Sequence, residues 1–394
     1  VYKECKGVPK GNCLTKEQRL SLQMDEFMNR RYEFRYNTQI GEVEYRERFS
    51  FQFYFHSIDK RAQNSIMLDA QSEGIGVWDR DIDRYLHSNR VPIYNPLEEF
   101  LFHLPHWDGK DRIHALANRV PCKNPHWELL FHRWFLNMVS HWRGVDKMHA
   151  NNTSPILVGR QGTHKSTFCR EMIPPALRAY YTDSIDFSHK RDAELYLNRF
   201  ALINIDEFDQ ITLPQQGFLK HILQKPVVNL RKPHGRSVLE LQRYASFIGT
   251  SNQKDLLTDP SGSRRFICIE VTGNIDTTQP IDYEQLYAQA MHEIHHGERY
   301  WFDSEDEQIM TENNREFEQT PAMLQLFYQY FKTAQTKEEG EFLTPVEILN
   351  YLKKKSGMSL SDNKVYHFGR LLQKCGIPSK HTYKGTVYQV IKLS

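Results

Sequence analysis

The residues of this chain that are best suited to chemistry lie in a glycine-rich stretch, residues 155–167, Pro-Ile-Leu-Val-Gly-Arg-Gln-Gly-Thr-His-Lys-Ser-Thr. An apolar run leads into a turn, and a helical pattern begins after it. In a phosphate-binding loop of this layout, backbone N–H groups point at phosphate oxygens, the lysine supplies positive charge for the outer phosphates, and the serine ligates Mg²⁺. We therefore predict a site for ATP and Mg²⁺. The predicted nucleotide-binding residues are Gly159, Arg160, Gln161, Gly162, Thr163, His164, Lys165, Ser166 and Thr167.

His164 departs from the usual pattern of such loops, in which a glycine precedes the lysine. The glycine often needs a positive φ and lets the phosphate approach closely. Any other residue there costs roughly 1–2 kcal/mol, although histidine tolerates the left-handed backbone better than most. We expect ATP binding to be retained, and a protonated His164 would add a cation beside the phosphates. The alternative interpretation is a glycine-rich turn before a buried helix, without a ligand.

Two adjacent acids, Asp206 and Glu207, follow a second apolar run, Ala201–Ile205. After a phosphate loop, a strand that ends in two acids fits the second half of an ATPase site. Asp206 would hold the Mg²⁺ together with Ser166, and Glu207 would polarise the attacking water. The alternative is a buried strand that ends in a solvated acidic turn.

Two later apolar runs also have polar residues beside them: an asparagine follows the first run, and two arginines precede the second. Asn252 comes after Phe247–Thr250, and an amide at the tip of a strand can hold the attacking water or the γ-phosphate. Arg264 and Arg265 stand on a turn just before another strand-like run, which suits an arginine finger that neutralises charge on the transferred phosphoryl group. We predict catalytic roles for all three residues together with Lys165. The alternative for the arginines is a surface pair engaged in salt bridges.

A basic, proline- and glycine-containing stretch, residues 225–236, separates the second strand-like run from the third. Glu240 is the only acid near its cations, so they cannot neutralise one another's charge, and contacts to a DNA phosphate backbone are expected. A solvated basic loop is the alternative. The predicted DNA-binding residues are Lys225, Arg231, Lys232, His234 and Arg236, and Arg243 further on is counted with these cations.

These side chains need a sheet that brings the ends of their strands together. Helical segments separate the first two of four strand-like runs, and strands that alternate with helices predict a largely parallel α/β sheet. The four runs are Pro155–Val158, Phe200–Ile205, Tyr244–Gly249 and Phe266–Val271.

Elements outside the sheet suggest several further regions. A helix over Thr15–Asn29 and a hairpin over Arg31–Ser50 are expected near the start. Near the end, Thr344–Glu347 forms a capping box, two helices follow, and His381–Leu393 alternates like a hairpin, which is the order of a winged helix. We expect an N-terminal α+β region at 1–74, a mostly helical domain at 75–148, the ATPase domain at 149–304, a helical connector at 305–340 and a winged-helix-like domain at 341–394.

The order of these motifs resembles the virulence-associated protein E family, whose members are similar to superfamily 3 helicases and poxvirus-type primase-helicases. The likeness covers roughly residues 75–300, because Asn95–Leu97 and Trp107–Arg112 also resemble the helical segment before the motor of that family. The resemblance implies an AAA+-like P-loop NTPase core, a hexameric ring, DNA that passes through its pore, and an arginine finger that acts on the neighbouring subunit's ATP. It implies the ATP-site roles described above for Lys165, Ser166, Asp206, Glu207 and Asn252. It also implies the finger role for Arg264 or Arg265, and the pore-hairpin role for residues 225–236.

A rival motif, His292–His296, matches the H-E-x-x-H pattern of zinc proteases. Its helix ends at once in Gly297 and no third ligand stands out, so we expect a polar helix instead. Four tryptophans lie at helical spacing and are expected to be core residues more than a platform for bases. They are Trp107, Trp127, Trp134 and Trp142.

Bulk properties limit the classes of function. The 394 residues exceed one ordinary domain, and the net charge of +2 means that any nucleic-acid surface must be local. No apolar run approaches ~18 residues, so we expect no membrane span. Six scattered cysteines without a C-x-x-C pair indicate reduced thiols in a cytoplasmic protein, with no signal peptide. The chain begins with Val1, so we expect that it is cut from something longer.

The function that this sequence favours is an ATP-driven DNA helicase or translocase for the replication of a phage or mobile element. Three alternatives stay open: a nucleotide-gated DNA-binding initiator with weak or no ATPase activity, a metalloprotease, and an ATPase that remodels protein partners.

Overall fold

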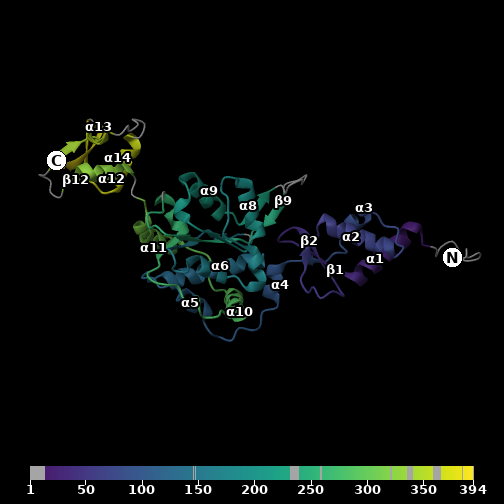
Figure 1. The fold of residues 1–394 in the computed structure, drawn as a ribbon. Helices are drawn as coiled ribbons and strands as arrows, with labels where there is room; N and C mark the ends of the chain where they lie inside the picture. The colour runs from purple at the N-terminus through teal and green to yellow at the C-terminus, as the bar shows by residue number, and fades with distance from the viewer. Residues whose placement is uncertain are drawn as a thin grey trace, which may run out of the picture. The chain divides into compact units, whose positions relative to one another are not determined.

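The computed structural model describes two compact units (Figure 1). The first is formed by residues up to 254 together with 259–315, and the second by 255–258 together with 316–394. The described residues are 14–144, 146, 148–230, 239–257, 260–319, 322–334, 340–357, 365–383 and 385–393.

A five-stranded parallel sheet forms the centre of the first unit. Its strands lie in the order β11-β5-β10-β7-β6, and every neighbouring pair is parallel. All residues of β5, β7 and β10 are buried, as expected for a parallel sheet covered on both faces. The predicted parallel α/β sheet is therefore confirmed, with β6 as an additional short strand. The strands are β5 (Ser154–Val158), β6 (Tyr181–Thr182), β7 (Leu202–Ile205), β10 (Ser246–Ser251) and β11 (Phe266–Glu270).

The register brings the carboxyl ends of three strands to one edge of this sheet. Ser251 of β10 pairs with Val158 of β5, and Gly249 of β10 pairs with Ile205 of β7. A side chain at Gly249 would be crowded, because a Cβ there would lie 2.8 Å from Cδ1 of Ile156 and 3.2 Å from the carbonyl oxygen of Ile205. The loops that follow residues 158, 205 and 251 therefore emerge next to one another, where ligands of parallel sheets bind.

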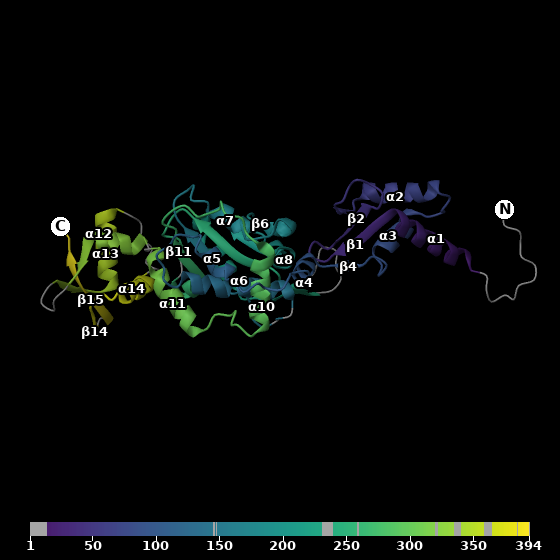
Figure 2. The ribbon, with the colours of Figure 1, turned by 90° about the horizontal axis from the view of Figure 1, so that it is seen from below.

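Helices cover both faces of the sheet. Figure 1 shows α8 (Lys190–Arg199) and α9 (Leu213–Leu223) on one side and α5 (Arg112–Ala117), α6 (Trp127–Arg143) and α10 (Tyr283–His295) on the other. The view from below in Figure 2 brings α5, α6 and α10 in front of the strands. They are joined on this face by α4 (Pro96–Phe102), whose Leu97 and Leu101 belong to the same core.

Helix α6 is buried on nearly all of its sides and forms the centre of the core under the sheet. A helix with apolar residues all round belongs in the interior of a domain. Trp127, Trp134 and Trp142 all lie in this core, which confirms their predicted packing role. Trp107 is half-buried, and its Nε1 donates a hydrogen bond to the carbonyl of Lys110.

The first unit begins with a smaller α+β element. The predicted helix and hairpin are both present, and the capping box at Thr15 explains where α1 begins. Its hydrophobic core runs from Phe27 to Val91, so residues on both sides of the predicted boundary after residue 74 pack together. The elements are α1 (Lys16–Arg31), β1 (Tyr32–Asn37), β2 (Glu42–Glu47), β3 (His56–Ser57), α2 (Lys60–Ser72), α3 (Asp79–Leu86) and β4 (Ile93–Tyr94).

The second unit packs helices on a small antiparallel sheet in which β15 pairs with β12, β13 and β14. The predicted capping box is present, because the hydroxyl of Thr344 accepts the backbone N–H of Glu347 at 3.2 Å. The winged-helix assignment stays a prediction. The elements are α12 (Ala322–Tyr330), β12 (Phe331–Thr333), β13 (Glu341–Leu343), α13 (Pro345–Ser356), α14 (Val365–Lys374), β14 (Ser379–Thr382) and β15 (Gly385–Lys392).

Candidate active site

The predicted phosphate loop connects β5 to α7 (Lys165–Glu171) at the edge where the three strand ends meet. Its first residue, Gly159, donates its N–H to the carbonyl of Ser251 at 3.0 Å, which ties the loop to β10. A Cβ at Gly159 would lie 3.0 Å from the carbonyl oxygen of Val271, so any side chain there would crowd this backbone. Gly162 has φ +83°, a conformation in which a side chain is strained.

His164 adopts the left-handed backbone conformation that a glycine would normally occupy, with φ 64° and ψ 23°. Its carbonyl accepts the N–H of Phe168 at 2.9 Å, so α7 starts regularly after it. The histidine therefore adopts a strained backbone conformation, and the loop has the turn that a glycine at this position would give. Among the described non-glycine residues only His164 and Glu207 have a positive φ, and strained residues concentrate at functional sites.

The ammonium group of Lys165 lies inside the loop. It donates to the carbonyls of Gly159 and Arg160, both at 2.7 Å, and contacts Oδ1 of Asn252 at 3.2 Å. Burial lowers the pKa of the Lys165 ammonium below its usual value. These contacts join the loop after β5 to the tip of β10.

Asp206 lies at the end of β7 and is contacted by two hydroxyl groups. Ser166 donates to its Oδ1 at 3.0 Å, and Thr250 donates to the same oxygen. Oxygen atoms of a carboxylate and of hydroxyls are the ligands that Mg²⁺ prefers. The structure therefore brings the two predicted metal ligands, Ser166 and Asp206, together and adds Thr250, to which the sequence reasoning gave no role.

Asp209 is a second acid that the sequence reasoning missed. Its Oδ1 accepts the hydroxyl of Ser251 at 2.8 Å and the N–H of Asn252 at 3.4 Å. It lies on the short 3-10 helix η2 (Phe208–Gln210), whose tight turn carries Asp209 back toward β10. The spacing of three residues from Asp206 is the only signal in the sequence that could have identified it. Asp209 fixes the tip of β10 and thereby the position of Asn252.

Glu207, the predicted activator of water, is exposed and follows Asp206 directly, with φ 53°. Glutamate rarely adopts this backbone conformation, which costs of order 1–3 kcal/mol. The strain turns the chain sharply after β7 and leads into η2.

The two predicted finger arginines lie at the end of the 3-10 helix η3 (Pro260–Arg265), directly before β11. Arg264 is exposed and forms an ion pair of 2.8 Å with Glu307 of α11 (Ser304–Asn314). Arg265 is half-buried. The carboxylate that pairs with Arg264 is thus on α11, whereas Lys165, Asp206 and Asn252 gather around the phosphate loop.

Of the predicted DNA-binding stretch, the described part includes strand β8 (Val227–Leu230), which pairs in antiparallel register with β9 (Leu239–Gln242). The base of this strand pair is fixed by an ion pair of 2.6 Å between Lys225 and Glu194 of α8. Four predicted contacts lie outside the described residues: Arg231, Lys232, His234 and Arg236.

Arg243 does not belong with the exposed cations, and its grouping with them is wrong. Its guanidinium is fully buried and donates to main-chain carbonyls from several segments, so it holds the hairpin base, the end of α9 and the start of β10 together. Burial lowers its pKa to about 9. The acceptors are Asn151, Ile222, Leu223, Lys225 and Ala245.

The zinc-protease pattern has a structural role on α10. Glu293 pairs with His132 of α6 at 2.6 Å and accepts from Gln289, while the ring of His292 stacks on that of His296. Within the described part of the chain, no group of three His, Cys, Asp or Glu residues is arranged to hold a metal ion.

Comparisons with family models give two matches, which together cover residues 101–390. A family model described as the virulence-associated protein E-like domain matches residues 101–319, and a second, a domain of unknown function described from B. Theta, matches residues 320–390. No curated protein matches the chain. Within the described residues, no helix has the length and apolar character needed to cross a bilayer.

Solved structures with a similar trace include two of the NrS-1 C-terminal region. The apo structure of residues 305–718 has a TM-score of 0.46 and 12% identity, and the match covers 97% of this chain and 100% of that chain. The A form apo structure of the same region also has a TM-score of 0.46 and 12% identity, with 94% and 99% covered.

Proposed function

The chain belongs to the family of virulence-associated protein E-like domains, and from this premise we propose that it is an ATP hydrolase that drives a DNA helicase or translocase. The setting of this activity is the replication of a phage or mobile element. The family membership concerns residues 101–319, which include the phosphate loop and every described residue of the candidate site.

One observation carries the proposal: side chains from the ends of three parallel strands meet in two adjoining groups. Lys165 of the loop after β5 contacts Asn252 after β10, and Ser166 of the same loop contacts Asp206 after β7. A cation for phosphate, an amide and an acid with a hydroxyl beside it are the parts that phosphoryl transfer to water requires. An empty glycine-rich turn before a buried helix would not require any of these contacts.

Mg²⁺ fits the oxygen atoms of Ser166 and Asp206, with the hydroxyl of Thr250 on the same carboxylate oxygen. Magnesium prefers oxygen ligands and keeps several waters, so one carboxylate and one hydroxyl are sufficient protein ligands beside nucleotide phosphates. When bound, the ion would offset the negative charge of the β- and γ-phosphates.

In the reaction, Lys165 holds the outer phosphate oxygens and Asn252 orients the γ-phosphate or the attacking water. Glu207 takes a proton from the water, the water oxygen bonds to the γ-phosphorus, and the bond to the β,γ-bridging oxygen breaks. ADP leaves with the electron pair of that bond, and inorganic phosphate is the second product.

Completion of the site needs a neighbouring subunit. Arg264 is exposed and pairs with Glu307 of α11, and in this proposal it acts on a neighbour's nucleotide and stabilises the transition state there. A homo-oligomer, a hexameric ring in this proposal, follows from that role. In this proposal the basic residues 231–236, which lie between β8 and β9 in the sequence, contact the DNA phosphates.

A nucleotide-gated DNA-binding initiator with weak or no hydrolysis is the second candidate. It is favoured by His164, since a side chain stands where the usual loop has glycine, and by the strain of its left-handed backbone. Such a protein would bind duplex DNA in response to ATP without separating the strands.

A strand-displacement assay on forked DNA separates the two candidates. The first predicts ATP-dependent release of the displaced strand by the wild type and none by Lys165→Ala. Nucleotide-dependent DNA binding without any strand release would overturn the helicase proposal in favour of the initiator.

A further inference from the structure

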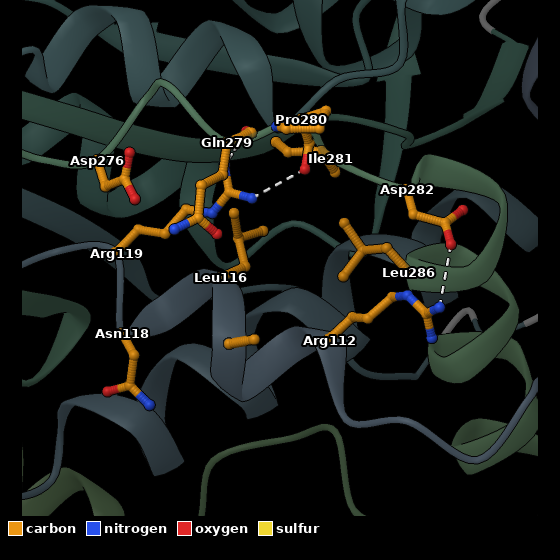
Figure 3. Close-up of a pocket in the computed structure, with 11 residues that line it drawn as sticks. Arg112, Leu116, Asn118, Arg119, Asp276, Gln279, Pro280, Ile281, Asp282 and Leu286 are labelled. Carbon is orange, nitrogen blue, oxygen red and sulfur yellow. Dashed lines mark hydrogen bonds and ion pairs between the residues drawn. The ribbon is translucent and has the colours of Figure 1, made fainter.

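We propose that a cavity beside α5 receives the base and ribose of the nucleotide whose phosphates the loop at 159–167 binds. The cavity has a volume of about 330 Å³ and lies between α5 and the segment 276–286 (Figure 3). This inference rests on the proposed function. It assigns a binding site to the nucleoside of ATP, which the phosphate loop does not contact.

The orientation of a bound nucleotide across the sheet would place its nucleoside at this cavity. The γ-phosphate end belongs beside Asn252 and Asp206, which follow β10 and β7 on one side of β5. The nucleoside therefore extends to the other side of β5, where β11 lies. The chain that leaves β11 forms one wall of the cavity.

The segment after β11 runs along the phosphate loop before it reaches the cavity. Val271 donates its N–H to the carbonyl of Val158 at 2.7 Å, and Ile275 donates to the carbonyl of Thr163 at 3.1 Å. The next residue, Asp276, lines the cavity and donates its N–H to the carbonyl of Arg119 at 3.1 Å. Cavity and loop thus share a hydrogen-bonded wall and lie within the reach of one nucleotide.

The lining suits a flat, polar-edged group. Figure 3 shows the apolar side chains of Leu116 and Leu286 between two polar ends, with Asp276 and Gln279 at one end and Asp282 at the other. Apolar side chains can cover the faces of a base, a carboxylate can accept a ribose hydroxyl as in dinucleotide sites, and an amide can bond to a base edge. The volume falls at the lower limit of small-ligand sites, roughly 300–1,000 Å³.

The two arginines of the cavity are occupied by the protein and do not make it a second phosphate site. Arg112 forms ion pairs with Asp108 at 2.6 Å and with Asp282 at 3.0 Å. Arg119 donates to the carbonyls of Gln279 at 2.8 Å and Pro280 at 3.1 Å, a contact that Figure 3 shows as a dashed line. Both side chains hold the segment 276–282 in place, which favours a nucleoside over a free anion.

The test compares a ligand with a nucleoside and one without. ATP and inorganic tripolyphosphate, each with Mg²⁺, are titrated calorimetrically into the wild type, Ala115→Trp and the control Ala115→Ser. Ala115 lines the cavity from an exposed position of α5, so tryptophan fills the space with little disturbance of the core. We expect Ala115→Trp to weaken ATP about tenfold or more, about 1.4 kcal/mol, with tripolyphosphate unchanged and Ala115→Ser like the wild type.

Asp276→Asn is a second variant, in case tryptophan at position 115 disturbs the fold and both ligands are lost. It keeps the shape of the side chain, and it is expected to weaken ATP several-fold while tripolyphosphate binding stays intact. Unchanged ATP affinity in both variants would overturn the cavity assignment and leave the phosphate site standing. A wild type that binds neither ligand would overturn the proposed function itself, and the cavity assignment with it.

Discussion

The hydroxyl of Ser166 on the phosphate loop donates a hydrogen bond of 3.0 Å to Oδ1 of Asp206, forty residues further along the chain. The two residues follow β5 and β7, which are not neighbours, because β10 lies between them. Thr250, on β10, donates to the same oxygen atom and completes the connection across the three strands. The site therefore depends on the strand order as much as on the motifs.

Position 164 is expected to tolerate glycine and to reject a β-branched residue. At φ 64° a valine side chain clashes with its own backbone, whereas glycine is unstrained. The free energy of unfolding of His164→Val should be lower than that of His164→Gly by about 1–2 kcal/mol. Urea unfolding followed by circular dichroism measures the difference, and equal stabilities would contradict a left-handed backbone here. His164→Gly should keep or increase ATP turnover.

Arg243 is expected to be essential for the stability of the first unit. Arg243→Met would leave several buried carbonyls without a donor, at a cost of about 3–5 kcal/mol. The matched control is Arg264→Met, which removes an exposed ion pair and should change stability by no more than about 1 kcal/mol. Chemical denaturation of both variants is the measurement. A loss in Arg243→Met no greater than in the control would refute the anchoring role.

Stability should fall with decreasing pH through His141. Burial and the nearby charge of Arg243 lower its pKa to about 3, from an ordinary value near 6.5, while Asp146 acts weakly in the opposite direction. Between about pH 6.5 and pH 3 the unfolded chain binds a proton that the folded chain does not, so stability rises with pH in this window.

The variant that tests this is His141→Gln, which retains an acceptor for the N–H of Asn151, now bound by Nε2 at 2.8 Å, and does not titrate. Its unfolding free energy should drop less between pH 7 and pH 5 than that of the wild type. Identical pH profiles would show that His141 is protonated equally in both states.

The arginine of one subunit is expected to serve the nucleotide of another. Arg264→Ala should lower the turnover number for ATP by a factor of about 10³ or more, with little change in ATP affinity. A mixture with Lys165→Ala should recover activity, because each variant supplies the part that the other lacks. Turnover in mixtures of varied ratio is the measurement. Full activity of Arg264→Ala alone, or no recovery in the mixture, would exclude a role in trans.

The sheet and two residues of the site, Lys165 and Asp206, could be predicted because their signals are local. Apolar runs mark the buried strands, and Lys165 and Asp206 stand at fixed distances from the ends of such runs. The family was predictable from the order of the same motifs, and the match over residues 101–319 confirms it.

Other features of the site depend on tertiary structure and could not be predicted. Asp209 reaches Ser251 through a tight turn, and its position three residues after Asp206 does not by itself predict that contact. Arg243 looked like a surface cation because its charge stands in a basic stretch. Its main-chain acceptors come from segments up to 92 residues away, so only the folded chain reveals that it is buried.

ATP turnover with and without single-stranded DNA tests the central claim most directly. Three proteins suffice: the wild type, Lys165→Ala, and the matched control Lys254→Ala, which removes an exposed lysine paired with Glu270. The account predicts Mg²⁺-dependent hydrolysis by the wild type and the control, stimulated by DNA, and none above background by Lys165→Ala. Turnover in Lys165→Ala equal to that of the wild type, or no turnover in any protein with DNA present, would contradict it.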